Sequence, residues 1–128
     1  MRSRARPGFS LLELFLALVV IGILVGLAIP RFRAYERKVY IAAMVDELRD
    51  LAVREESYRR GVGAYTSDVS VLGFVASPGV TVTVVRADSA GWSARAIHGQ
   101  SAATCAISYG TAPVLPPATV KNFVGCAR

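Results

Sequence analysis

The sequence is poor in the side chains that carry catalysis. It contains a single histidine, His98, and has no catalytic triad, no paired-carboxylate pattern and no phosphate-loop pattern. We therefore expect no enzymatic activity, no cofactor and no bound metal. His98 is predicted to lie on the surface at the end of a strand. The single tryptophan, Trp92, is predicted to pack in the core or at an edge of the fold.

Polar side chains are also missing from a long stretch near the N-terminus. Leu14 to Ile29 contains none, and counting from Phe9 gives 21 residues interrupted only by Ser10 and Glu13. A helix of that length spans a bilayer, whose hydrocarbon core takes about 20 apolar residues. A carboxylate inside such a span costs roughly 2.5 to 3.5 kcal/mol on insertion scales. Glu13 is therefore a candidate functional residue that needs a partner.

The positive charge of the chain is unevenly placed. The net charge is +6, and Arg2, Arg4 and Arg6 supply half of it ahead of the apolar stretch. By the positive-inside rule these arginines hold the N-terminus in the cytoplasm, so the chain after Pro30 is predicted to lie on the far side of the membrane. The later basic residues alternate with acidic ones, as in "RFRAYERK" and "DELRDLAVREE". That pattern indicates a solvated helix face rather than a nucleic-acid surface.

The apolar stretch continues into an amphipathic pattern without a break. No glycine or proline occurs from Arg31 to Arg60, and Gly61 and Gly63 then supply a stop signal. We therefore predict one helix from Phe9 to Arg60. Apolar residues recur along its second half mostly every three to four positions, at Phe32, Tyr35, Val39, Ala42, Val45, Leu48, Ala52 and Tyr58.

Three residues mark the weakest part of this helix. Gly22 and Gly26 precede Pro30, which removes one backbone hydrogen bond and clashes with the preceding turn. The group is either an ordinary kink of a membrane helix or a flexible segment with a function.

The C-terminal half predicts a small antiparallel sheet. After a mixed loop over 61–79, Val80 to Arg86 alternates with a period of two and is mostly β-branched. Trp92 to His98 and Thr104 to Tyr109 are two further strands, and Thr119 to Val124 is a weaker fourth candidate. One apolar face of this sheet is expected to pack on the second half of the helix, which gives an α+β fold.

Two cysteines occur, Cys105 and Cys126, and both lie on the exported side of the predicted topology. An oxidising compartment favours a disulfide. It would close a 22-residue segment counting both cysteines, worth about 3 kcal/mol in the loop-entropy model. Two unpaired thiols or metal ligands are the alternatives, although a zinc site needs more ligands than these residues and His98 supply.

The stretch "RPGFSLLEL" resembles the processing site of type IV prepilins and of the related pseudopilins of type II secretion. A basic leader ends at Gly8, an aromatic Phe9 follows, a glutamate stands four residues later, and a proline closes the apolar helix. The close similarity covers about residues 6 to 35, and the rest agrees in architecture. The resemblance implies five parts: a leader peptide over 1–8, a transmembrane and assembly helix over 9–30, an amphipathic half over 31–60, a linking loop over 61–79, and a sheet with a disulfide-bounded region over 80–128.

The resemblance also implies how these residues act. In that family a membrane aspartyl prepilin peptidase cuts between the residues equivalent to Gly8 and Phe9 and N-methylates the new terminus. Glu13 of an incoming subunit then faces the Phe9 amine of its neighbour in the fibre, which removes the cost of an unpaired carboxylate. The implied partners are the peptidase, an assembly platform with minor pilins, and further copies in a helical filament. The implied location is the bacterial inner membrane, crossed once, and then an extracellular fibre.

Two alternatives use the same N-terminus. An ordinary secretory signal also has basic residues before an apolar stretch, but Gly26 and Ala28 make a poor cleavage site, and Glu13 would interrupt the apolar region of the signal. A pseudopilin of type II secretion shares the helix, and such proteins typically bind calcium through carboxylates in their C-terminal loops. Here no aspartate or glutamate follows Asp88, so hard oxygen ligands are scarce.

The cysteine pair instead resembles the disulfide-bounded region of type IV pilins, and prolines stiffen the enclosed loop without a core of its own. A type IV pilus subunit serving adhesion, twitching motility or DNA uptake is therefore the first hypothesis, and a pseudopilin is the second. Direct DNA binding is a third, and scattered cations favour it little. The cations in question are Arg86, Arg95, Lys121 and Arg128.

Overall fold

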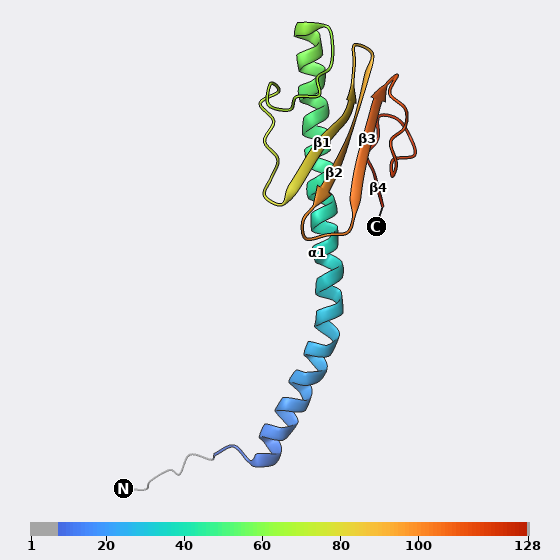
Figure 1. The fold of residues 1–128 in the computed structure, drawn as a ribbon. Helices are drawn as coiled ribbons and strands as arrows, with labels where there is room; N and C mark the ends of the chain where they lie inside the picture. Colours follow the sequence, from blue (N-terminus) through green and yellow to red (C-terminus); the bar gives the residue numbers. More distant parts are fainter. Residues whose placement is uncertain (1–7, 128) are drawn as a thin grey trace, which may run out of the picture. The chain divides into compact units, whose positions relative to one another are not determined.

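One helix and four strands make up the described part of the chain, residues 8–127 of a computed structural model (Figure 1). In chain order the elements are α1 (Leu11–Val62), β1 (Val80–Ala87), β2 (Gly91–His98), β3 (Thr104–Gly110) and β4 (Gly125–Ala127). They belong to two compact units, of which the first ends at Glu36 and the second begins at Arg37. The second unit contains the whole sheet and the part of α1 that packs on it.

The helix ends at a glycine, although at only one of the two predicted. Gly61 lies inside α1, so the expectation that it stops the helix was wrong, since a helix tolerates an internal glycine at a cost of about 1 kcal/mol. Gly63 adopts a left-handed φ of 89°, and its N–H donates to the Arg59 carbonyl at 2.7 Å. That bond satisfies a carbonyl of the last turn, as is usual for a glycine that terminates a helix.

The core lies between α1 and the sheet, and α1 contributes three fully buried apolar residues to it. Met44, Leu48 and Leu51 have no exposed surface, and their spacing of four and three residues places them on one face. Of the predicted stripe Leu48 is buried, but Val39 and Ala42 are exposed, so the buried face is rotated from the predicted one. The facing residues from the sheet and the linking loop are Tyr65, Phe74, Val80, Trp92, Ala94, Ala96, Cys105 and Ile107.

The sheet is antiparallel, and its order β1-β2-β3-β4 follows the chain (Figure 1). The predicted α+β fold is therefore confirmed. Inward residues of β2 are buried while Arg95 and Ile97 are exposed, which is the alternation of a sheet with one covered face. A bulge between Val84 and Arg86 shifts the pairing of β1 with β2.

The fourth strand lies later than predicted. Thr119 to Val124 forms turns and bends rather than a strand, because Asn122 takes a left-handed φ of 67° and donates its N–H to the Ser108 carbonyl at 2.8 Å. Pairing with β3 begins only at Gly125, opposite Ala106. A Cβ at Gly125 would meet the Ala118 Cα at 2.4 Å, so the chain needs glycine where β4 starts.

Candidate functional site

The predicted cleavage residues precede the helix, and Ser10 caps it. Gly8 and Phe9 lie outside α1, and Phe9 is 80% exposed. The Ser10 hydroxyl accepts the N–H of Glu13 at 3.1 Å, and the Ser10 carbonyl accepts the N–H of Leu14 at 3.1 Å. Ser10 is therefore the N-cap and Glu13 the third residue of the first turn. Sequence reasoning missed this role, although serine followed by glutamate three residues later is the signature of a capping box.

The carboxylate of Glu13 has no ionic partner in the part of the chain that the structure describes. The residue is exposed in the first turn of α1, where a negative charge interacts favourably with the helix dipole. None of the ion pairs found within residues 8–127 uses Glu13. Its backbone N–H donates to the Ser10 hydroxyl, and that hydrogen bond does not involve the carboxylate.

The apolar part of α1 has no cover of its own. An 18-residue stretch of the helix has a mean hydropathy of 2.8 and none of it is buried, so by length and composition it is able to cross a membrane. Gly22, Gly26 and Pro30 all lie inside α1, and the helix continues past each of them. Contiguous apolar surface of this size needs lipid or protein to cover it.

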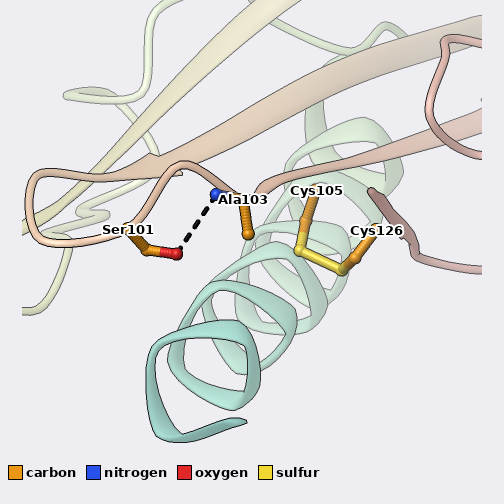
Figure 2. Close-up of a disulfide and its surroundings, with 4 residues drawn as sticks. All are labelled: Ser101, Ala103, Cys105 and Cys126. Atoms are coloured by element: carbon orange, nitrogen blue, oxygen red, sulfur yellow. Dashed lines mark hydrogen bonds between the residues drawn. A yellow bond between two sulfur atoms is a disulfide. The ribbon is translucent and has the colours of Figure 1, made fainter. Parts of the chain in front are cut away.

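A disulfide joins Cys105 on β3 to Cys126 on β4, as predicted (Figure 2). The two residues are direct partners in the antiparallel register, and their Cα atoms are 4.1 Å apart. Cys105 is fully buried in the core, whereas Cys126 is exposed. The bond therefore ties the short C-terminal strand to the buried strand beside it.

The loop enclosed by this disulfide packs more closely than expected. The sequence suggested a loop stiffened by prolines without a core, but Ala112 and Ala118 are buried. The Leu115 N–H donates to the Ser108 hydroxyl at 2.7 Å, and Ser108 is itself fully buried. The loop is thus anchored on β3, because small alanines permit its backbone to lie close to the strand.

His98 is not the surface residue that the sequence suggested. It is only 8% exposed, its ring stacks on Tyr40 with centroids 4.2 Å apart, and its Nδ1 accepts the Gln100 N–H at 3.0 Å. The alternation of β2 explains the error. His98 lies six residues after Trp92, so the two side chains lie on the same inward face of the strand. Trp92 is 1% exposed, so its predicted core position is confirmed.

Three of the four cations considered for DNA binding make a local contact. Arg86 pairs with Asp88 at 2.9 Å. Arg95 donates to the Pro116 carbonyl at 3.4 Å, and Lys121 donates to the Gly110 carbonyl at 3.0 Å. Arg128 lies outside the described residues, as do the arginines of the leader. Over the described range, no group of three or more His, Cys, Asp or Glu has an arrangement that would hold a metal ion.

A buried carboxylate on α1 escaped the sequence analysis. Glu55 has no exposed surface and lies four residues after Leu51 on the buried face. Its Oε2 accepts the Thr66 N–H at 3.0 Å, whereas Oε1 has no hydrogen-bond partner within residues 8–127. Burial raises the pKa of Glu55, and the Thr66 hydrogen bond opposes that rise in part.

Comparison with known proteins gives a partial similarity. No family model matches the chain. Two curated proteins of Pseudomonas aeruginosa, both named "Fimbrial protein", are each 35% identical to it over 54 residues. The aligned part covers 42% of this chain and 35% of each relative, so the match spans about a third of the length of the relatives. Over that part, this chain is similar to fimbrial proteins.

Proposed function

We propose that this protein is a structural subunit of a type IV pilus and polymerises through its N-terminal helix. The observation that carries the proposal is an uncovered apolar stretch of α1 in a chain whose remaining part folds as a helix and sheet. The similarity to proteins named for fimbriae supports it. Such a subunit is stored in the inner membrane, with its N-terminus in the cytoplasm, and then moves into an extracellular fibre.

Processing precedes assembly in this proposal. A prepilin peptidase removes the leader over 1–8 by cutting between Gly8 and Phe9, and then N-methylates Phe9. Both residues are exposed and precede the helix, so their backbone is accessible to the peptidase. Gly8 has no side chain to obstruct that approach.

The new terminus then gives Glu13 its partner. The Phe9 amine of one subunit pairs with the free Glu13 carboxylate of its neighbour inside the bundle of helices over 9–30. A paired carboxylate in a protein bundle costs much less than an unpaired one in lipid, so the pair favours transfer from the membrane to the filament. Gly22, Gly26 and Pro30 supply a flexible segment that adjusts the helix during this transfer.

The Cys105–Cys126 disulfide favours a pilus subunit over the alternative, a pseudopilin of a type II secretion system. In this reading 31–60 is the amphipathic half of the helix, 61–79 the linking loop, and 80–128 the sheet with its disulfide-bounded region.

The genes beside this one discriminate between the two functions. A retraction motor and a pilus outer-membrane pore support the pilus, and a complete secretion operon supports the pseudopilin.

The proposal is tested on fibres sheared from the cell surface. Intact-mass and N-terminal peptide analysis should find this chain in the fibres, beginning at Phe9 and carrying one N-methyl group. A chain that begins at Met1, or after Ala28 as a secretory signal would leave it, contradicts the prepilin reading. Absence of the chain from fibres that contain other subunits contradicts the structural role.

A further inference from the structure

The sequence directly after the apolar stretch is strongly basic. Residues 31–38, "RFRAYERK", contain four cations and one acid, Glu36. Under the proposed topology these cations lie on the exported side, where the positive-inside rule does not require them. Long exported domains cross the membrane largely regardless of charge, so the cations do not set the orientation of the chain. They need another explanation.

Six of these residues, 31–36, belong to the first unit. Four of the six form what we name the exit ring: Arg31, Phe32, Arg33 and Tyr35. Phe32 is 63% exposed, Tyr35 is 66% exposed, and both arginines are exposed. No ion pair or side-chain hydrogen bond within the described range uses either arginine. Among residues 8–127, their charges therefore have no partner.

The directions of these side chains favour a partner that surrounds the helix. Successive residues of an α-helix are rotated by about 100°. Arg31 and Tyr35 therefore point to nearly the same side, Phe32 points about a quarter turn away, and Arg33 points to the opposite side from Arg31. A protein docked on one face would contact part of this set. A bilayer around a membrane-spanning helix contacts all of it.

The dimensions agree with the headgroup layer of a membrane. At about 1.5 Å per residue, the helical part of the proposed span, residues 11–30, is about 30 Å long, and the hydrocarbon core is about 30 Å thick. From Arg31 to Tyr35 the helix rises about 6 Å, and the headgroup region on each side is about 5 to 8 Å thick. Tyrosine is among the side chains enriched at both membrane interfaces. A basic side chain close to a surface of anionic lipid is attracted to the headgroups.

We propose that the exit ring binds anionic phospholipid headgroups at the exported surface of the membrane and so sets the depth at which the subunit is held before assembly. This inference rests on the membrane anchoring in the proposed function. Contact with anionic lipid strengthens binding about fivefold per arginine. Arg31 and Arg33 together should therefore favour the position in which they touch the headgroups about 25-fold over a position in which they do not.

The test uses the full chain carrying Tyr35→Trp, reconstituted in vesicles of phosphatidylcholine with or without added phosphatidylglycerol. Acrylamide quenching reports the exposure of the introduced tryptophan to water. The native Trp92 is 1% exposed and contributes a small, constant background that the parent chain measures. Quenching should be several-fold weaker in the anionic vesicles, and high salt should restore it, because salt screens surface charges.

Two double variants in the Tyr35→Trp background distinguish the effect of the arginines in the exit ring from the effect of positive charge elsewhere on α1. Arg31→Gln with Arg33→Gln should abolish the difference between the two lipids. Arg49→Gln with Arg60→Gln removes the same charge from exposed positions elsewhere on α1 and should preserve it.

Three results overturn the inference in distinguishable ways. Equal quenching in both lipids, in a chain that resists carbonate extraction, refutes headgroup binding and leaves the membrane anchor intact. Failure of the chain to insert into either vesicle refutes the anchor and the exit ring together. If quenching of the introduced tryptophan weakens as more protein is added per vesicle, and does not depend on lipid charge, these residues belong to a contact between subunits.

Discussion

Replacing Glu13 by alanine should separate the folding of the subunit from its assembly. In the isolated chain the Glu13 side chain is exposed and forms none of the ion pairs in the described range. Its loss removes a favourable helix-dipole interaction of about 0.3 to 1 kcal/mol. It also removes a carboxylate that costs roughly 2.5 to 3.5 kcal/mol in a membrane, so insertion should be at least as favourable as before.

Neither the sheet nor the cleavage site should respond to this change. β1 begins at Val80, in the second unit, and substitutions far from a region usually leave its stability unchanged. The residues that flank the cut remain Gly8 and Phe9. The Glu13→Ala subunit should therefore be inserted, processed and folded like the parent.

Assembly should respond strongly, because each subunit added would bury a Phe9 amine without its counter-charge. Breaking a buried ion pair costs about 3 to 5 kcal/mol. Since 1.4 kcal/mol is a factor of ten, each addition should be weakened about 100-fold to several thousand-fold. The loss recurs along the fibre, and it exceeds the helix-dipole interaction by about threefold or more.

Two further variants distinguish the charge from the capping of the helix. Ser10→Ala removes the hydroxyl that accepts the Glu13 N–H at 3.1 Å, at a cost of about 1 kcal/mol, and keeps the carboxylate. Glu13→Gln removes the charge and keeps a side chain suited to a capping box. If the charge governs assembly, Glu13→Gln should behave like Glu13→Ala, and Ser10→Ala should still form fibres.

The assay compares processed subunit in the inner membrane with sheared fibre from the same cells. Normal processed subunit with little or no fibre is the expected result for Glu13→Ala and Glu13→Gln. A normal fibre yield from Glu13→Ala removes this residue from the assembly mechanism. If Ser10→Ala loses fibres as completely as Glu13→Ala, the start of the helix rather than the charge is responsible.

Two remaining predictions concern the second unit. Because burial raises the pKa of Glu55, the folded chain holds this proton more tightly than the unfolded chain. Its contribution to stability is therefore complete below the ordinary pKa of 4.5 and is lost as the pH rises through the raised value. Urea unfolding of the full chain in detergent, repeated across this pH range, gives the unfolding free energy at each pH. Glu55→Gln should make that free energy fall less steeply with pH, and an unchanged pH dependence would contradict a raised pKa for Glu55. Non-reducing peptide mapping should find Cys105 linked to Cys126, and replacing both by alanine should cost about 3 kcal/mol of unfolding free energy; two cysteines open to alkylation in denaturant without reductant would refute the bond.

Local patterns predicted the elements of the fold more closely than their packing. The first three strands begin and end within one residue of their predicted bounds, because β-branched alternation and the turns between them are local signals. The buried face of the helix was displaced, since Met44 and Leu51 pack on the sheet and were not in the predicted stripe. A helix with several neighbouring apolar rows has more than one candidate face, and the sheet selects among them.

Long-range constraints account for the errors near the C-terminus and in the core. Thr119 to Val124 has the composition of a strand, but the pairing of Cys105 with Cys126 puts β4 at Gly125–Ala127. A glutamate in a charged helix is ordinarily solvated, and burial of Glu55 follows from the return of the chain to place the Thr66 N–H against it. Neither contact is visible in a window of neighbouring residues.

The predicted site residues came from a motif, and the structure adds how two roles coexist in its first turn. The Ser10 hydroxyl accepts the backbone N–H of Glu13, and the carboxylate of Glu13 has no ionic partner among residues 8–127. Starting the helix and pairing with a neighbour therefore do not compete for the same atoms. Under the proposed function, a serine and a glutamate at this spacing would keep the helix start intact both before and after the carboxylate pairs with a neighbour. Residues in contact, as Ser10 and Glu13 are, ordinarily show a coupling of about 0.5 to 3 kcal/mol. If the two roles use separate atoms, a double-mutant cycle of Ser10→Ala and Glu13→Gln on fibre yield should give a coupling below that range.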